Sequence, residues 1–561
     1  MSQTRAQQLV AAYDRRMADA GNFWNLYQEA TEFTNPVHSN VQKQLAPGSR
    51  QMNRVFDSTA IRARKLLAAT MAGSLTPNAL KWHALRMRED DLNDIKEVAE
   101  WLQECDDRLF MAFQQSNFEG SSTQFYGNAI IGTGALLIEE QPKLRSGQFG
   151  GFQFTALPLG RYVIDEAPNG LVDTLYRSYM STAKAIVQRF GNDEDTVGRE
   201  VLAAYEQRPE QTFEVIHGVY PRGLHDPSKA ALDGTNRAYA SCYTLRKGQP
   251  KFLYEGGYHE FPVCVARWDK EASEVYGRGP AVDALPDTRT LNRAIELMLR
   301  AAGKDIDPPW AGIDGAISDL DLTPGAYNTV EAIDGDVRKA LMPLHSGISM
   351  DLTQFIVADQ RAKVEQAFYW DQLQLNKDTL MTATEVERRW EVMRRILGPT
   401  LGRFRWEFMT PLINVCFATM LRANAFSAPP EELLQRSDGN IDVVFQGPLD
   451  SSQKFARVTG FNEWMNSGAL IAQATGSTAH FDNANFDVAW TDQRDILGLP
   501  ATYERDSEEV AQTREQRAQE QQAQQQQMTA LNVTKAAKDG GAALKSVHEI
   551  GQNGTAQKVP A

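Results

Sequence analysis

The sequence predicts an α+β fold that is mainly helical, and three observations carry this prediction. Apolar residues recur at helical spacing up to about residue 140 and again after about residue 283. Between about residues 150 and 270 the pattern changes to short aromatic and β-branched runs that Gly, Pro and Asn separate. Two long helical segments, 283–303 and 349–375, bracket a Pro- and Gly-rich insertion at 304–348.

The composition is that of a globular chain with an acidic balance. Of the 561 residues, 42% are hydrophobic and 23% are charged, and the formal net charge is −14. This charge excludes a protein that binds nucleic acid tightly through bulk positive charge. No apolar run approaches the ~20 residues of a membrane-spanning helix, and the N-terminus lacks the apolar core of a secretory signal. We therefore expect no membrane segment and a protein that stays in the cytosol where it is made.

The part of the chain before residue 150 predicts three helices and a strand. One helical stretch covers residues 1–35, and a second helix begins at the N-cap candidate Asp57 or Ser58. A third, amphipathic helix is predicted over 92–118, and Ala135–Ile138 has the apolar character of a buried strand.

The strand-rich part of the chain, from about 150 to 270, contains runs such as TLYRSYM, FEVIHGVYP and FPVCVARW. One helix, Ala183–Phe190, interrupts these runs. The pattern therefore predicts a β-rich region set into a helical protein.

The two long helical segments have incomplete apolar faces. The first, 283–303, has an apolar face that runs through Leu291, Ile295 and Leu299. The second, 349–375, would span roughly 40 Å, and its apolar stripe near Phe355 gives way to charge. Such faces suggest packing against neighbouring subunits on one side and solvent on another. The charged candidates on these helices are Arg289, Arg293, Arg300, Arg361 and Lys363.

The insertion at 304–348 is rich in aspartate, and a short strand at Tyr327–Val330 is plausible within it. Its acidic residues could bind a cation, but a solvated acidic face is the favoured interpretation, and we predict no metal site. The aspartates concerned are Asp305, Asp307, Asp314, Asp319, Asp321, Asp334 and Asp336.

A long kinked helix is predicted over 382–422. Thr382 and Glu385 form a capping box at its start, and kinks are expected at Gly398-Pro399 and at Pro411. The residues expected to form the core of this helix are Val386, Trp390, Met393, Leu397, Phe404 and Phe408.

The remaining sequence changes character twice. Residues 423–500 are mixed, with one clear strand at Ile441–Phe445. Residues 501–527 are charged and then Gln-rich, which predicts a helix without an apolar face that is stable only in a bundle or a ring of copies. Residues 528–561 are predicted to be a disordered tail.

Motifs of catalysis and cofactor binding are absent from the sequence. There is no GxxxxGK[ST], HExxH or GxSxG, and the eight histidines stand apart without ligand spacing. The four cysteines have no CxxC spacing, which argues against zinc and a disulfide framework. We predict no enzyme, no catalytic residues and no cofactor.

Four segments resemble one family, the head-to-tail connector (portal) proteins of short-tailed bacteriophages (podoviruses). They are FDSTAIRARKLLAATMAGSLTP at 56–77, YGNAIIGTGALLIEE at 126–140, VYGRGPAVDALPDTRTLNRAIELMLRAAGKDIDPPW at 275–310 and MTATEVERRWEVMRRILGPTLGRFRWEFMTPLI at 381–413. The third segment is the most specific, and the four occur in the family's order. The resemblance extends to about residue 500.

The resemblance implies a subunit of a twelve-fold ring with a wing, a two-helix stem, a clip and a helical crown. The segments that would form these parts are 1–282 and 423–500 (wing), 283–303 and 349–375 (stem), 304–348 (clip), 376–381 (tunnel loop), 382–422 (long kinked helix) and 501–527 (crown). The tunnel-loop residues expected to line the DNA channel are Asn376, Lys377, Asp378 and Thr379. For this loop, a plain helix–helix turn is an equally weighted interpretation.

The resemblance also implies a function and a set of partners. The ring would sit at one capsid vertex of the virion and conduct double-stranded DNA during packaging into the procapsid and during ejection. Its partners would be further copies of the chain, the large terminase subunit, the major capsid and scaffolding proteins, the tail adaptor and internal core proteins. Assembly would take place in the cytoplasm of the bacterial host.

Two other functions remain open at this point. The chain could be another virion component, such as a tail or internal core protein, which predicts a different oligomer without a central channel. Less favoured is an enzyme with a metal site at the acidic insertion, which predicts tight binding of a divalent metal.

Overall fold

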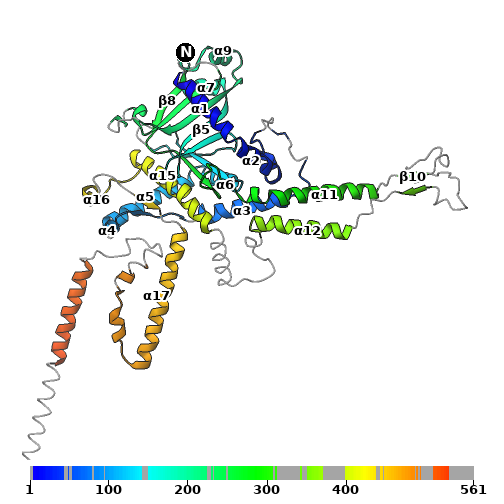
Figure 1. The fold of residues 1–561 in the computed structure, drawn as a ribbon. Coiled ribbons are helices and arrows are strands. Elements are labelled where there is room, and N and C mark those ends of the chain that lie inside the picture. Colours follow the sequence, from blue (N-terminus) through cyan, green and yellow to red (C-terminus); the bar gives the residue numbers. More distant parts are fainter. Residues whose placement is uncertain are drawn as a thin grey trace, which may run out of the picture. The chain divides into compact units, whose positions relative to one another are not determined.

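The structure is a computed structural model, and its described part forms two compact units (Figure 1). The first unit contains residues 1–88, 104–428 and 440–452, and the second contains 89–103, 429–439 and 453–561. No described helix is both long and apolar enough to cross a membrane. The described residues are 4–42, 48–49, 54–78, 81–93, 95–141, 149–223, 229–230, 233–247, 251–306, 310–312, 341–343, 350–370, 398–436, 443–445, 448–486, 488–490, 493 and 509–529.

Helices form the N-terminal part of the first unit, as predicted. The stretch predicted over 1–35 is divided in two at Ala20, and a capping box of Thr4 and Gln7 begins the first helix. The bounds are α1 (Arg5–Asp19), α2 (Gly21–Thr34), α3 (Thr59–Leu75), α5 (Lys96–Gln114, shared with the second unit) and α6 (Phe118–Ala129).

Two antiparallel sheets confirm the predicted β-rich region. The smaller has the order β3-β2-β9 and the larger the order β4-β5-β6-β7-β8. Their bounds are β2 (Thr133–Glu140), β3 (Phe152–Ala156), β4 (Tyr162–Glu166), β5 (Val172–Thr182), β6 (Thr212–Pro221), β7 (Tyr239–Leu245), β8 (Phe252–Tyr258) and β9 (Val263–Arg267). The predicted helix is also confirmed, as α7 (Ala183–Phe190).

Helices cover the larger sheet. On one side, α1 buries Leu9 and Tyr13, and the Tyr13 and Ser178 hydroxyls share a hydrogen bond of 2.9 Å. Gly218 permits this close contact, because a Cβ there would lie 3.0 Å from a Leu9 methyl carbon. Val215, Tyr243 and Leu245 of the sheet share an apolar core with α7 and α9 (Arg199–Gln207).

Two long helices, α11 (Leu285–Ile306) and α12 (Met350–Ala367), lie side by side and extend from the sheets of the first unit (Figure 1). The paired strands β10 (Trp310–Gly312) and β11 (Leu341–Pro343) belong to the segment between them. The prediction that the second helix continues to residue 375 is wrong. It ends at Ala367, and Tyr369 has a positive φ of 58°, which a helix cannot accommodate.

The described chain resumes at residue 398 as a helix that contains a π-helix, Arg405–Met409, and continues as α15 (Thr410–Arg422). The predicted strand at Ile441–Phe445 is present as β12 (Val443–Phe445), which pairs with β1 (Leu85–Met87).

The second unit is helical where it is described. Its elements include α4 (Asp90–Asn93), α16 (Glu431–Arg436), most of α17 (Pro448–Thr475) and the short 3-10 helix Ala479–Asn483. Helix α17 was not predicted, because the pattern of residues 423–500 is mixed. Residues 509–529 are helical and almost entirely exposed, as expected for the helix predicted over 501–527 without an apolar face.

Candidate functional site

The pair α11 and α12 is the candidate functional site that the structure describes most fully. The two helices pack on one another and bury apolar side chains on one stripe of each. The buried apolar residues of the pair are Leu285, Leu291, Ile295 and Ala301 on α11 and Val357, Val364 and Phe368 on or just after α12. One apolar stripe of each helix is therefore already buried within the subunit.

Other apolar side chains of the same two helices are exposed. Phe355 on α12 is 73% exposed and Ile356 is 45% exposed. On α11, Leu299 is 54% exposed, which corrects the prediction that it shares a face with the buried Leu291 and Ile295. These apolar side chains are left uncovered by the packing of α11 on α12.

A hydrogen-bonded joint fixes the base of the pair to the rest of the first unit. The side-chain oxygen of Asn292 on α11 accepts hydrogen bonds from the backbone N–H groups of Phe56 (2.7 Å) and Asp57 (3.0 Å). The Asp57 carboxylate in turn accepts from Arg361 Nε (2.9 Å) and Nη2 (2.8 Å) on α12, and from the backbone N–H of Thr59 (2.7 Å) at the start of α3. Three helices thus meet at two buried polar side chains.

The charge of Asp57 is maintained by this joint. Burial alone would raise the pKa of the carboxyl, but the hydrogen bonds from Thr59 and Arg361 outweigh it and hold the pKa below its ordinary value. The joint is therefore an ion pair at neutral pH, and its charge-assisted bonds set the direction in which α11 and α12 leave the body.

The five cations predicted on these helices all have carboxylate partners within the chain. Arg289 pairs with Glu29 of α2, and Arg361 pairs with Asp57. The other pairs are Arg293 and Arg300 with Glu296, and Lys363 with Asp359. The exposed pairs contribute little stability, but the four carboxylates offset most of the positive charge of the five cations.

Most of the other predicted site residues lie outside the described residues. Of the acidic residues of the insertion, Asp305 is described, in the last turn of α11. The predicted residues outside the described part are Asp307, Asp314, Asp319, Asp321, Asp334, Asp336, Asn376, Lys377, Asp378, Thr379, Val386, Trp390, Met393 and Leu397, and the strand expected at Tyr327–Val330 lies there too.

Phe404 and Phe408 of the long kinked helix are fully buried. Phe408 stacks on Phe125 of α6, with ring centroids 4.1 Å apart. Phe404 stacks on Tyr126, the next residue of α6, at 6.1 Å. These contacts attach the helix to α6, which itself packs on the smaller sheet.

The sequence explains why a π-helix forms at Arg405–Met409. Pro411 lies four residues after Glu407 and has no N–H to donate to the Glu407 carbonyl. A kink was expected at Pro411. The structure has a π-helix, which is a widened helical turn, at Arg405–Met409, shortly before this proline. This turn directs the Glu407 carboxylate into the interior, where it is 7% exposed.

A buried ionic network holds the π-helix to both sheets. Glu407 accepts hydrogen bonds from the backbone N–H (2.9 Å), Nε (3.1 Å) and Nη2 (2.7 Å) of Arg267, a fully buried residue at the end of β9. Arg267 also pairs with Glu166 of β4, which Lys270 contacts at 2.8 Å. Two cations and two carboxylates therefore balance one another. Sequence reasoning missed this network, although an arginine at the end of the apolar run FPVCVAR was a signal.

Two solved chains that are similar to this chain belong to gene transfer agent (GTA) particles. One chain from the neck of an empty GTA particle, computed with C6 symmetry, has a TM-score of 0.33 and 13% identity over 74% of this chain and 91% of that chain. One from the virion of a native gene transfer agent particle has a TM-score of 0.28 and 13% identity, with coverages of 72% and 98%.

Sequence relatives cover most of the chain. A probable portal protein of Bordetella phage BPP-1 is 29% identical over 485 residues, which are 84% of this chain and 83% of that protein. A portal protein of Salmonella phage epsilon15 is 26% identical over 529 residues, or 92% of each chain. The model of the family described as bacteriophage head to tail connecting protein matches residues 6–503. The chain therefore belongs to the family of bacteriophage head to tail connecting proteins.

Proposed function

We propose that this portal protein forms a twelve-subunit ring at one vertex of a phage capsid and conducts double-stranded DNA in both directions. DNA would enter the procapsid through the ring during packaging and leave through it during ejection. The observation that carries the proposal is the family match over residues 6–503, together with the two portal proteins that resemble almost the whole chain. In this role the chain is a structural component of the virion and has no catalytic step of its own.

Within the subunit, we assign α11 and α12 to the stem, and the segment 304–348 between them to the clip. Residues 376–381 would form the tunnel loop and 382–422 the long kinked helix. Residues 1–282 and 423–500 would form the wing, and 501–527 the crown. The packing of α11 on α12, with the joint of Asn292, Asp57 and Arg361 at their base, supports a stem of fixed direction.

The exposed apolar side chains of the stem support a ring. Phe355, Ile356 and Leu299 lie on helices whose buried stripes are already occupied within the subunit. In a closed ring each subunit presents one side of its stem to the next, so these side chains would be buried without any further partner. Burying one large apolar side chain stabilises an interface by about 1.5–3 kcal/mol.

The charge of the subunit supports a channel through which DNA slides. The net charge is −14, and each of the five stem cations has a carboxylate partner, although Arg293 and Arg300 share Glu296. Phosphate contacts by unpaired Lys and Arg are what hold DNA in place on a protein. A stem surface whose cations are paired would therefore retain DNA weakly, as a conduit requires.

The remaining partners follow from the position at the vertex. The clip would contact the large terminase subunit during packaging and the tail adaptor afterwards, and the wing would contact the major capsid protein, the scaffolding protein and any internal core proteins. No membrane is involved in this scheme, and assembly would take place in the cytoplasm of the bacterial host.

Replacing Phe355 with aspartate tests the stem interface. Because Phe355 is 73% exposed in the subunit, we expect the Phe355→Asp variant to fold normally but to stay monomeric, since a charge would be buried between subunits. Size-exclusion chromatography with light scattering measures the mass, and circular dichroism the fold. The control is Met111→Asp, an equally drastic change on the exposed face of another helix, which should still form rings. Rings of normal mass from Phe355→Asp would contradict the stem interface.

A further inference from the structure

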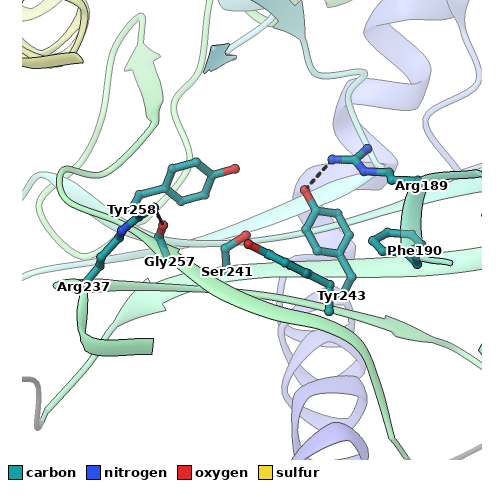
Figure 2. Close-up of a pocket in the computed structure, with 8 residues that line it drawn as sticks. Arg189, Phe190, Arg237, Ser241, Tyr243, Gly257 and Tyr258 are labelled. Carbon is teal, nitrogen blue, oxygen red and sulfur yellow. Dashed lines mark hydrogen bonds between the residues drawn. The ribbon is translucent and has the colours of Figure 1, made fainter. Parts of the chain in front are cut away.

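A pocket of about 280 Å³ lies on the larger sheet, away from the stem helices. The end of α7 contributes Arg189 and Phe190, β7 contributes Ser241 and Tyr243, and Arg237 precedes β7. The other lining residues come from β8 and are Tyr254, Gly257 and Tyr258. Figure 2 shows the pocket, with Gly257 and Tyr258 labelled. The volume is just below the range of about 300–1,000 Å³ that is usual for pockets that bind drug-sized molecules, so only a small ligand would fit.

The walls of the pocket are aromatic and its polar groups are mainly donors. The Arg189 guanidinium lies 4.9 Å from the centre of the Tyr243 ring and donates a hydrogen bond of 3.1 Å to the Tyr243 hydroxyl. Arg237 donates to the Gly257 carbonyl at 2.9 Å and to the Ala230 carbonyl at 3.2 Å, which fixes its position. None of the described lining residues is Asp or Glu.

Ser241 and His217 beneath the pocket look like a nucleophile and its base, but they cannot act as one. Arg177 Nε donates to His217 Nδ1 at 3.1 Å, so the ring proton is on Nε2, which donates to Ser241 Oγ at 3.0 Å. Burial, together with the charges of Arg177 and Arg189, also holds the pKa of His217 well below its ordinary value. The serine therefore keeps its proton and serves as a donor.

The charges around the pocket sum to a positive value. Arg177, Arg189 and Arg237 contribute three positive charges, and Glu139, at 3.5 Å from Arg189 and 3.9 Å from Arg177, contributes one negative charge. A net charge of about +2 in this region contrasts with the −14 of the whole chain. The side chain of Arg189 remains 48% exposed, so its other N–H groups are open to solvent.

We propose that this pocket binds a small anion attached to a flat ring, with the anionic group on Arg189 and the ring against Phe190 and the exposed ring of Tyr254, because His217 and Arg189 already cover the two faces of Tyr243. Arginine suits this ligand because its planar fork pairs with a carboxylate while its face stacks on aromatic rings. Two sources can supply such a group, namely a free aromatic carboxylate or a protein chain that ends in an aromatic residue.

Saturation-transfer NMR on the purified full-length protein tests the pocket, with benzoate as the probe and benzamide as its neutral isostere. We expect saturation transfer to benzoate and at least tenfold weaker binding of benzamide, because a charge-assisted hydrogen bond is lost. N-acetyl-phenylalanine, which imitates a chain end, distinguishes the sources: tighter binding than benzoate assigns the pocket to a protein terminus, and weaker binding to a free molecule.

Substitutions of the lining residues test whether benzoate binds in this pocket. Arg189→Gln should weaken benzoate about tenfold, and Tyr258→Phe should weaken it by a smaller factor. Arg199→Gln is the matched control, because Arg199 is exposed on α9 and pairs with Glu194 outside the pocket. Circular dichroism checks that each variant folds. Equal binding of benzoate and benzamide, no transfer to benzoate, or unchanged binding in a folded Arg189→Gln variant would each overturn the proposal.

Discussion

Replacing Glu407 with alanine is expected to lower the free energy of unfolding by about 3–5 kcal/mol. The variant leaves Arg267 fully buried, with its backbone N–H and Nε deprived of their Glu407 acceptor and with Nη2 bonded to the Gly170 carbonyl alone. Glu166 remains as the only carboxylate of the network, and Lys270 shares it. Urea denaturation followed by tryptophan fluorescence measures the loss.

An exposed ion pair provides the control for this variant. Arg422 donates two hydrogen bonds, of 2.6 and 2.5 Å, to the Glu260 carboxylate in a bidentate ion pair, but each side chain is more than a third exposed. Glu260→Ala should therefore cost less than about 1 kcal/mol. If the two variants lose the same stability, burial does not govern the Arg267–Glu407 pair, and its role in fixing the π-helix is wrong.

Replacing Phe408 with alanine is expected to cost a similar amount, about 3–5 kcal/mol, for a different reason. The ring is fully buried against Phe125 and Tyr126, so its removal leaves a cavity between the long helix and α6. The effect should appear as a lower urea midpoint with little change in the slope of the transition, since the fold itself is unchanged.

The matched control for this change lies on the same π-helix. Trp406 is 59% exposed, so Trp406→Ala should change stability by no more than about 0.5 kcal/mol although it removes a larger side chain. If Trp406→Ala lowers the free energy of unfolding as much as Phe408→Ala, the assignment of Phe408 to the interior and Trp406 to the surface is wrong.

Local patterns in the sequence predicted those elements whose character depends on their own residues. Ala183–Phe190 was predicted to the residue, because its apolar spacing contrasts with the alternating strands on either side. The long helix α11 and the β-rich region were predictable in the same way. The family was predictable from four segments in order, which no single local pattern would have identified.

The errors arose where distant parts of the chain decide the outcome. Leu299 has the right type and spacing to share the apolar face of Leu291 and Ile295, but it is exposed on α11, which extends from the body. The early end of α12 depends on the left-handed conformation of Tyr369, which no residue type there signals. The Arg267–Glu407 pair joins residues 140 positions apart, and a sequence pattern carries no information on such a contact.

The most direct test of the central claim is to image the purified protein by negative-stain electron microscopy and count the subunits in end views. The portal assignment predicts closed rings of twelve subunits with a central channel and a narrower stalk formed by the stem helices. Monomers, or compact dimers without a central opening, would contradict it.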